Sequence, residues 1–395
     1  MATVHSDLTA MEKDLFAYTQ ERNYDEVKRL LQAENVFVDC VDDDGMTPLQ
    51  HAAYKGAYKI CKLLLDCGAN VNLSRHVSRY SALTFAGLSG RDDVVRLLLE
   101  HGANPTSVNS INKTASQMAA FVGNHHVVSI INNFIPISEI HYFTKCQDLE
   151  TEPRLPLEMA SVVHRMAIMT NINPVRLAMY IQANPSLIEN AKKVARLFEN
   201  LSKKNFHEAG NELLSLKFHH LSYVLLACDK FIAEQKSKAG ASAERPVKEC
   251  LSPLIKHWIK GDINGFPVSL EKFLRTDVLA FPYVECNLFH QLVTTLAPLK
   301  VGEEPSAISI VSEAVSGQRG MDNPSPCGTC GNPNAEKKCS ACKSIQYCDQ
   351  TCQKLHWFTH KTICSHLLKM NDDTKQSTSD PEIKNPDEAG CSYKD

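Results

Sequence analysis

The sequence predicts a mainly α-helical protein with three successive parts: a repeat solenoid, a helical middle region and a small cysteine-rich module. Three observations predict this fold class. A pattern with a period of about 33 residues recurs in the first third of the 395-residue chain. The middle of the chain has helical apolar spacing without a repeat that can be named. Seven of the 15 cysteines lie between Cys327 and Cys364.

The repeat covers residues 8–137, as a degenerate first unit and three recognisable ones. DGMTPLQHAAYKGAYKICKLLLDCGANVN at 44–72 is echoed by RYSALTFAGLSGRDDVVRLLLEHGANPT at 79–106, and more weakly by NKTASQMAAFVGNHHVVSIINNF at 112–134. Gly56, Gly90 and Gly123 mark one position of the pattern, at intervals of 34 and 33 residues. LFAYTQERNYDEVKRLL at 15–31 keeps the same phase.

These units resemble the ankyrin repeat. The resemblance implies two short helices per unit, whose aliphatic residues bury against the next unit. Gly68 and Gly102 are expected to end second helices with a left-handed backbone. Ankyrin stacks in general bind proteins along the concave face of turn tips and inner helices. The exposed candidates here are Met46, Tyr54, Arg79, Tyr80, Leu88 and Asn109. The alternative is that Tyr54 and Tyr80 only cover the stack.

Residues 138–300 are expected to be helical and to pack against the repeats. Asn173-Pro174 and Asn184-Pro185 each place a capping residue before a proline, which is typical of a helix start. Residues 236–244, KSKAGASAE, are expected to form a polar loop. The Pro, Gly and Ser content of residues 301–326 predicts a linker. Residues 365–395 are expected to be an acidic disordered tail, because few apolar residues there can be buried.

The cysteine-rich module spans residues 327–364 and offers metal ligands in pairs: Cys327–Cys330, Cys339–Cys342, Cys348–Cys352 and His360–Cys364. Eight sulfur or imidazole donors satisfy two tetrahedral zinc ions, each of which takes four. A disulfide framework is the alternative. The seven thiols, the histidine partner and the absence of a signal-peptide pattern disfavour it. Two zinc ions would also stabilise a segment that has few apolar residues for a core.

The ending of this module, YC-x3-CQ-x3-W-x2-H-x3-C, resembles the MYND zinc finger. Spacing alone permits either a sequential or an interleaved arrangement of the ligands. The resemblance implies the interleaved one: Cys327, Cys330, Cys348 and Cys352 on the first zinc, and Cys339, Cys342, His360 and Cys364 on the second. His356 lies four residues before His360 and could compete as a ligand.

Members of the MYND family bind short proline-containing peptides against a small hairpin and the helix that follows it. The matching residues here are Ser344, Ile345, Gln346, Gln353 and Trp357. An exposed aromatic side chain beside the backbone of an edge strand suits an extended ligand. The alternative is that Trp357 only packs on the zinc core.

Charge and motifs limit the classes of function. The formal net charge is -3, and thiolates offset the lysines of the finger, so nucleic-acid binding is disfavoured. No apolar run approaches the length of a membrane span, which predicts a protein without membrane insertion. The chain has no GxxxxGK loop, no GxSxG elbow and no SET-like NHxxxPN segment, and its one HxD, at residues 5–7, lies at the N-terminus. We therefore expect no enzymatic activity.

Ankyrin repeats, a helical middle, a single MYND finger and an acidic tail, in that order, are similar to the ankyrin-repeat and MYND-domain-containing proteins, especially to members with few repeats. The resemblance implies a cytoplasmic scaffold that handles signalling proteins destined for the cilium. One alternative is a nuclear transcriptional co-repressor adaptor, which a basic import signal would favour, and the chain has none. The other is a MYND-containing methyltransferase-like enzyme.

Overall fold

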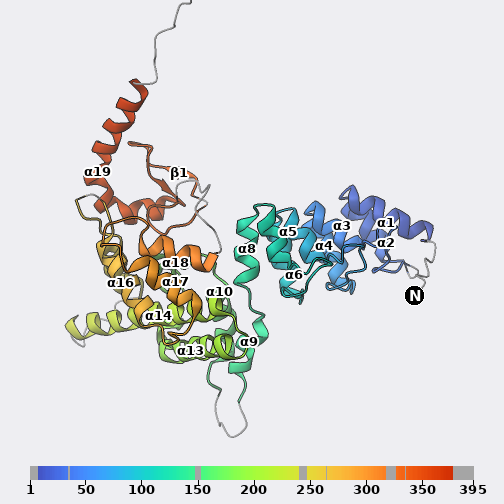
Figure 1. Ribbon diagram of the computed structural model, residues 1–395, viewed down its shortest axis with the longest axis horizontal. Coiled ribbons are helices and arrows are strands. Elements are labelled where there is room, and N and C mark those ends of the chain that lie inside the picture. Colours follow the sequence, from blue (N-terminus) through green and yellow to red (C-terminus); the bar gives the residue numbers. More distant parts are fainter. Residues whose placement is uncertain are drawn as a thin grey trace, which may run out of the picture. The chain divides into compact units, whose positions relative to one another are not determined.

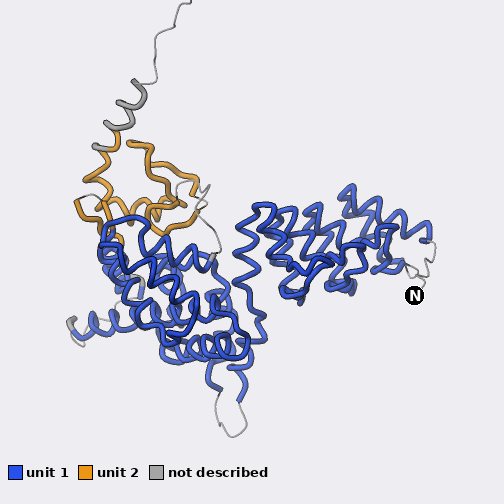
Figure 2. The backbone as a smooth tube through the Cα atoms, in the orientation of Figure 1, with its two compact units in different colours: residues 1–258, 267–322 blue, residues 259–266, 323–395 orange. Residues whose placement is uncertain are grey.

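The computed structural model describes residues 8–33, 36–146, 153–239, 247–263, 265–316, 326–333 and 335–376 (Figure 1). The chain divides into two compact units, residues 1–258 with 267–322 and residues 259–266 with 323–395 (Figure 2). The elements of the described ranges are α1 Ala10–Gln20, α2 Tyr24–Leu31, α3 Pro48–Lys55, α4 Tyr58–Asp66, α5 Ala82–Leu88, α6 Asp92–Glu100, α7 Ala115–Phe121, α8 His125–Asn132, α9 Ile137–His141, η1 Tyr142–Thr144, η2 Leu157–Met159, α10 Ala160–Ala167, α11 Pro174–Ala183, α12 Ser186–Glu189, α13 Ala191–His207, α14 Glu212–Ala239, α15 Val247–Ile259, α16 Val268–Leu279, α17 Asn287–Leu296, α18 Ala307–Ser316, β1 Lys337–Lys338, β2 Gln346–Tyr347 and α19 Gln350–Gln376.

Helices α1 to α8 form two layers, with α1, α3, α5 and α7 packed in succession in one layer and α2, α4, α6 and α8 in the other. Ala52, Ala86 and Ala119 are completely buried at the same position of three successive first helices. Their small side chains let neighbouring helices approach closely, as the repeat pattern predicted. Gly68 and Gly102 have φ values of 88° and 85°, which confirms the predicted left-handed ends of α4 and α6.

Hydroxyl side chains start the first helices. Thr47, Ser81 and Thr114 each accept a hydrogen bond from the backbone N–H three residues further on. Gln50 completes a capping box with Thr47 and also donates to the Leu73 and Tyr80 carbonyl oxygens, which ties its repeat to the next one. The third repeat has Ala82 where the second has Pro48, and the Ser81 cap is sufficient to begin its helix.

One side chain organises the turn before each of α3, α5 and α7. Asp42, His76 and Asn109 occupy the same position of the repeat, and each accepts a hydrogen bond from the backbone N–H two residues later. The backbone then takes a left-handed conformation at Gly45, at Arg79 (φ 55°) and at Asn112 (φ 58°). Arg79 therefore keeps the turn that a glycine makes in the preceding repeat.

The helical middle region continues in the same compact unit. Asn173 caps α11 and Pro174 is its first residue, as predicted. Leu187, Ala191, Val194, Phe198 and Leu201 are buried apolar residues at helical spacing, and Asn190 divides them between α12 and α13. The long helices α13 and α14 pack against each other. Their Phe198 and Phe218 rings stack with centroids 6.0 Å apart at the centre of this pair.

The predicted linker at 301–326 contains a structured helix, α18, which corrects that expectation. Ala307, Ile310, Val311 and Val315 are buried against α8, α14, α16 and α17. The buried Glu271 carboxylate accepts a 2.8 Å hydrogen bond from the Ala307 backbone N–H at the start of the helix. Ser, Gly and Pro residues flank a short apolar helix here, so composition alone indicated a linker.

Two further boundaries differ from the sequence predictions. Helix α14 runs to Ala239, into the predicted polar loop 236–244, and the rest of that loop lies outside the described residues. Helix α19 runs to Gln376, into the predicted tail, and residues 377–395 lie outside the described part of the chain. Within the described ranges, no helix combines the length and the apolar content that crossing a membrane requires.

Candidate metal centre and binding surfaces

The second unit is built around two turns that each present a pair of cysteines. In the first turn, the Gly331 N–H donates to the Cys327 carbonyl oxygen, and Gly331 has a φ of 67°. In the second, the Lys343 N–H donates to the Cys339 carbonyl oxygen, and Lys343 has a φ of 57°. The left-handed residue turns the chain so that both sulfur atoms of a pair face the same side. Strand β2 and helix α19 bring in the remaining ligands.

The first cluster consists of Cys327, Cys330, Cys348 and Cys352, whose sulfur atoms all lie within 4.8 Å of one another. The Cys330 sulfur is 3.6 Å from that of Cys348 and 4.0 Å from that of Cys352. Contacts from the Cys330 and Cys352 thiols lower the pKa of Cys327. The same contacts raise the pKa of Cys330 and Cys352, so they stabilise one thiolate, at Cys327. Cysteine binds zinc as the thiolate.

The second cluster consists of Cys339, Cys342, His360 and Cys364, and all four residues are buried. His360 Nε2 lies 3.3 Å from the Cys339 sulfur and 3.5 Å from the Cys342 sulfur. The Cys339 and Cys364 sulfur atoms are 3.9 Å apart. The imidazole therefore enters the cluster through one defined ring nitrogen.

Both clusters fit a tetrahedral zinc ion. Zinc–sulfur bonds of about 2.3 Å in a tetrahedron place the sulfur atoms about 3.8 Å apart. The sulfur–sulfur distances of 3.6–4.0 Å agree with that value. The two clusters make two four-ligand zinc sites, and the ligand sets are interleaved along the chain, as the family resemblance implied. Zinc in such closed sites is structural, because no coordination position is left open for a substrate.

His356 lies beside the metal centre without joining it. Its Nδ1 is 3.0 Å from the Tyr347 hydroxyl, and its ring stacks on His360 with centroids 5.8 Å apart. Burial, and after it the neighbouring His360, lowers the pKa of His356 to about 4. The neutral ring thus packs under the second zinc site, and Tyr347 fixes its orientation.

The predicted peptide surface lies on β2 and the first turns of α19. Trp357 is 46% exposed, while its ring contacts that of His360 with centroids 5.9 Å apart. The other candidates, Ser344, Ile345, Gln346 and Gln353, are half-buried. Trp357 therefore packs on a zinc ligand and also presents a face to solvent.

The edge-strand part of the peptide prediction is wrong. Gln346 pairs with Lys338 of β1 on one side and forms a parallel bridge with Cys327 on the other, and its carbonyl oxygen accepts from the Gly328 N–H. The backbone at Gln346 is thus flanked by chain on both sides. A peptide at this surface has to be recognised mainly by side chains.

The predicted ankyrin surface is exposed or half-buried at five of its six positions. Tyr54 is 50% exposed, Arg79 is exposed, and Met46, Tyr80 and Leu88 are half-buried. Asn109 is a correction, because it is only 4% exposed. Its side-chain oxygen accepts hydrogen bonds from the Ile111 and Lys113 backbone N–H groups, so it holds the turn instead of facing a partner.

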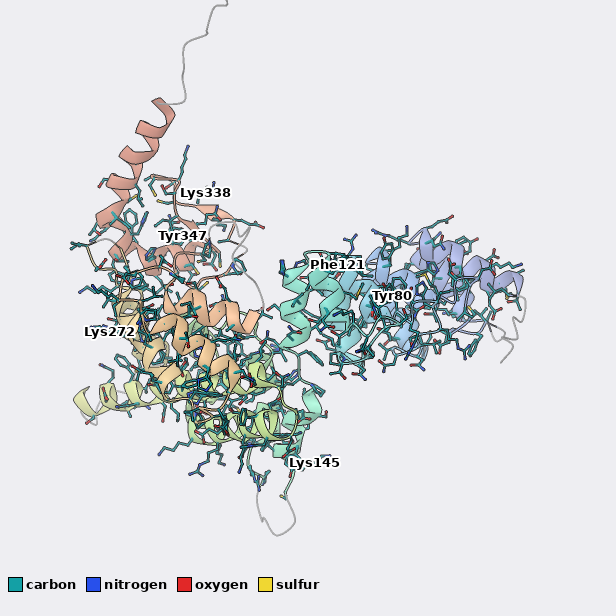
Figure 3. All side chains as sticks on the ribbon, in the orientation of Figure 1. Tyr80, Phe121, Lys145, Lys272, Lys338 and Tyr347 are labelled. Carbon is teal, nitrogen blue, oxygen red and sulfur yellow. The ribbon has the colours of Figure 1, made fainter. Side chains whose placement is uncertain are left out.

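Phe121, which is not among the predicted surface residues, is 85% exposed at the end of α7. Figure 3 marks it together with Tyr80. The signal was available, because Phe121 precedes Gly123 by two residues, as Tyr54 precedes Gly56 and Leu88 precedes Gly90.

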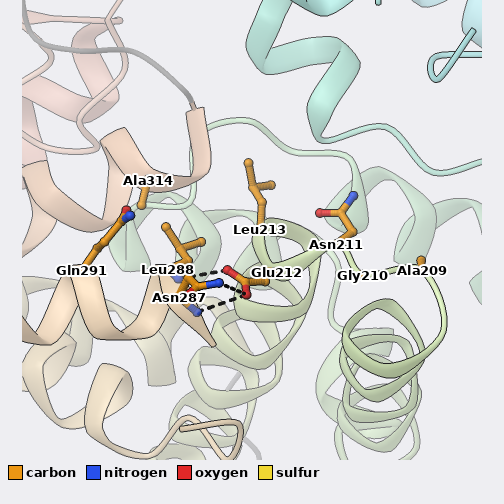
Figure 4. A pocket seen from close by; sticks show the side chains of 9 residues that line it. All are labelled: Ala209, Gly210, Asn211, Glu212, Leu213, Asn287, Leu288, Gln291 and Ala314. Carbon is orange, nitrogen blue, oxygen red and sulfur yellow. Dashed lines mark hydrogen bonds between the residues drawn. The ribbon is translucent and has the colours of Figure 1, made fainter. Parts of the chain in front are cut away.

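A pocket of about 530 Å³ lies beside the loop between α13 and α14 (Figure 4). Its one carboxylate, Glu212, accepts hydrogen bonds from the Asn287 and Leu288 backbone N–H groups and thereby caps α17. These backbone hydrogen bonds lower the pKa of Glu212. The carboxylate therefore serves the fold and is poorly suited to accept a proton from a substrate.

Two adjacent histidines of the middle region, the half-buried His219 and the buried His220, are also engaged in structure. His220 Nδ1 contacts the Asp277 carboxylate, and its Nε2 lies 2.8 Å from the Ile172 carbonyl oxygen. His219 Nε2 lies 3.2 Å from the Asp277 carbonyl oxygen. These contacts join α14 to α16 and to the chain before α11.

The repeats and the two zinc sites together define an ankyrin-repeat protein that carries a MYND zinc finger. Residues 15–109 match the family model for ankyrin repeats (3 copies), and residues 327–364 match that for the MYND finger. Dauer abnormal formation protein 25 of Caenorhabditis elegans is 33% identical over 348 residues, which cover 86% of this chain and 88% of that protein. The chain belongs to the family of ankyrin-repeat and MYND-finger proteins that includes this nematode protein.

Other similar proteins match a smaller part of the chain. The 26S proteasome non-ATPase regulatory subunit 10 of Dictyostelium discoideum is 36% identical over 96 residues, which cover 24% of this chain and 40% of that protein. Palmitoyltransferase akr1 of Neurospora crassa is 31% identical over 118 residues, which cover 30% of this chain and 14% of that protein. Matches of this extent carry no activity over to this chain.

Proposed function

We propose that this protein is a non-catalytic adaptor with two binding surfaces. The ankyrin repeats bind other proteins along the layer of first helices, and the finger binds short proline-containing peptides. The adaptor works in the cytoplasm and handles signalling proteins that are destined for the cilium. Ankyrin repeats and MYND fingers are both interaction modules, which supports the general role.

One observation carries the peptide part of this proposal: Trp357 is 46% exposed although it packs against the zinc ligand His360. A half-exposed tryptophan held by a rigid metal site offers a large contact area at low entropic cost. Proline-rich segments suit such a surface, because they are extended before they bind.

The test of this part is titration of the full chain with a panel of short synthetic proline-containing peptides, followed by calorimetry. We expect Trp357→Ala to weaken binding about tenfold or more while native mass spectrometry still shows two zinc ions. The matched control is Lys354→Ala, an exposed change on the same helix, which should leave affinity unchanged. Equal affinity of the Trp357→Ala variant, or absence of binding to every peptide, would contradict the proposal.

The non-catalytic part has a separate test. A MYND-containing methyltransferase-like enzyme has to bind S-adenosylmethionine, so the purified chain is titrated with that cofactor. We expect no saturable binding. Saturable binding would replace the adaptor interpretation with an enzymatic one.

The cellular part rests on the family resemblance and is tested by fractionation and proximity labelling. We expect the tagged full chain in the cytoplasmic fraction and ciliary signalling proteins among its labelled neighbours. The Cys348→Ser variant should lose the neighbours that depend on the finger. A purely nuclear pool would favour a transcriptional co-repressor adaptor instead.

A further inference from the structure

The repeats carry a row of apolar side chains at one repeated position. Tyr54, Leu88 and Phe121 each lie two residues before a glycine with a left-handed backbone. They stand at or next to the C-terminal ends of the first helices α3, α5 and α7. First helices pack in succession, so the three side chains follow one another along a single layer.

An aromatic cluster joins this row to the tip of the turn before α5. The Phe85 ring contacts Tyr54, His76 and Tyr80 at centroid distances of 6.2, 5.3 and 5.5 Å. His76 also stacks on Tyr80 at 5.3 Å. The row and the tip of the turn before α5 therefore form one surface, and its aromatic side chains are held by their neighbours.

The turn tips carry acidic side chains at one end of the row, and basic side chains at its middle and at its other end. Asp43 and Asp44 are exposed in the turn before α3, whereas Arg79 and Lys113 are exposed in the turns before α5 and α7. Within the described ranges, none of these four side chains has an ion-pair partner. Side chains of opposite charge on a partner can therefore form ion pairs with them without breaking an existing ion pair.

We propose that this row, which we call the Tyr54–Leu88–Phe121 row, binds one amphipathic helix of a partner protein. The helix carries apolar side chains at about every seventh residue, a basic end over Asp43 and Asp44, and acidic side chains over Arg79 at the middle of the row and over Lys113 at its other end. This inference rests on the proposed adaptor function and specifies its ankyrin partner by chemistry and direction.

The spacing of the row matches a helix. Packed helices lie roughly 10 Å apart, so successive row positions are separated by about that distance. A helix rises about 1.5 Å per residue and advances about 10 Å in seven residues. Three row positions therefore correspond to about four turns of a partner helix.

The backbone hydrogen bonds that the partner has to make also favour a helix over an extended peptide. Among the described residues, the only sheet is β1–β2 of the finger, so the row offers no strand edge with which an extended peptide could pair. A helix satisfies its own backbone hydrogen bonds and needs only side-chain contacts.

The experiment selects displayed random peptides of about 20 residues on the full chain. The selection is counter-screened on the full chain with Tyr54→Asp and Phe121→Asp, and the enriched peptides are then synthesised. We expect apolar side chains at seven-residue intervals, helical circular dichroism on binding, and a loss of affinity of about tenfold or more with either substitution. Tyr58→Asp, on α4 of the other layer, is the matched control and should change affinity little, since Tyr58 is 40% exposed there.

Charge-reversal variants test the direction in which the partner helix lies along the row. The variant with Arg79→Glu and Lys113→Glu should bind the selected peptides less well and should regain affinity for peptides whose acidic side chains are made basic. Selection of proline-rich or alternating sequences, selection of no peptide, or affinity unaffected by Phe121→Asp would overturn the inference. These outcomes leave the adaptor function standing if Cys348→Ser and Trp357→Ala still remove finger-dependent partners, so the two failures are distinguishable.

Discussion

The Asn133 side chain donates a 2.9 Å hydrogen bond to the Val315 carbonyl oxygen, 182 residues further along the chain. Asn133 follows α8, the last helix of the repeats, and Val315 lies in α18. Both residues are completely buried. The end of a repeat stack exposes an apolar face that has to be covered. Helix α18 contributes to that cover, so the repeats depend on a helix that comes after the middle region.

This dependence predicts that a change in α18 loosens α8. Val315→Ala removes buried methyl groups and should cost about 2 kcal/mol of stability. We expect faster amide hydrogen exchange in α8 of the full chain, measured by mass spectrometry. The exposed Glu313→Ala on the same helix is the control and should leave exchange unchanged. If exchange rises in α18 alone, the repeats do not rely on this helix.

Lys217 predicts a pH dependence of stability. It is completely buried, its side-chain nitrogen lies 3.4 Å from the Asn133 carbonyl oxygen, and burial lowers its pKa well below 10.5. The unfolded chain therefore binds a proton that the folded chain does not. Stability should rise with pH from the lowered pKa up to about 10.5, by at most about 1.4 kcal/mol per pH unit.

Lys217→Met tests this pH dependence, because methionine fills the site without a charge. The variant should be more stable at neutral pH by about 1–3 kcal/mol, and its advantage should shrink as the pH rises. Urea unfolding of both proteins across pH 6 to 10 measures the difference. An advantage that is constant over this range would mean that Lys217 is charged in the folded protein.

Replacing Asn109 should lower the stability of the repeats without removing an exposed side chain of the ankyrin surface. Asn109→Ala leaves the Ile111 and Lys113 backbone N–H groups without their acceptor and should cost about 1–2 kcal/mol in thermal unfolding. Asn109→Asp should restore most of the loss, because Asp42 makes the same contacts in the second repeat. Full stability of the alanine variant would show that the turn holds without this side chain.

The zinc sites predict shared dependence on metal. Cys348→Ser removes a ligand of the first site. Strand β2, just before Cys348, pairs with β1, which directly precedes the second-site ligand Cys339. Native mass spectrometry should show two zinc ions in the unchanged protein and fewer in the variant. A strong chelator should unfold residues 327–364, because few apolar residues there can form a core without metal. Retention of two ions by Cys348→Ser would contradict the ligand assignment.

The sequence predicted those parts of the fold and site in which a residue type serves a single structural role. Gly56, Gly90 and Gly123 fixed the phase of the repeats, because a left-handed backbone favours glycine. The cysteine pairs identified the zinc ligands. Their assignment to two separate ions needed the family resemblance, because spacing alone permitted two arrangements.

The remainder depends on contacts between distant residues. Helix α18 was missed because Ser, Gly and Pro surround its apolar positions, and only the buried Glu271 shows that its start is fixed. The repeat pattern predicts Asn109 as a surface residue, whereas its side chain accepts hydrogen bonds inside a turn, which only the folded backbone shows. The sequence gives no sign that Lys217 is buried, since a lysine on a helix is ordinarily solvated.

The interleaved ligands also constrain how the finger can form during synthesis. The ligands of each ion enclose part of the other set in the chain, so the ribosome has to deliver Cys352 before the first site can close and Cys364 before the second can. Until Cys348 and His360 follow, each site has only the two ligands of its first cysteine pair: Cys327 and Cys330, or Cys339 and Cys342. The nascent protein thus carries thiols without a complete metal site through this stage, and the second site closes only after the first can.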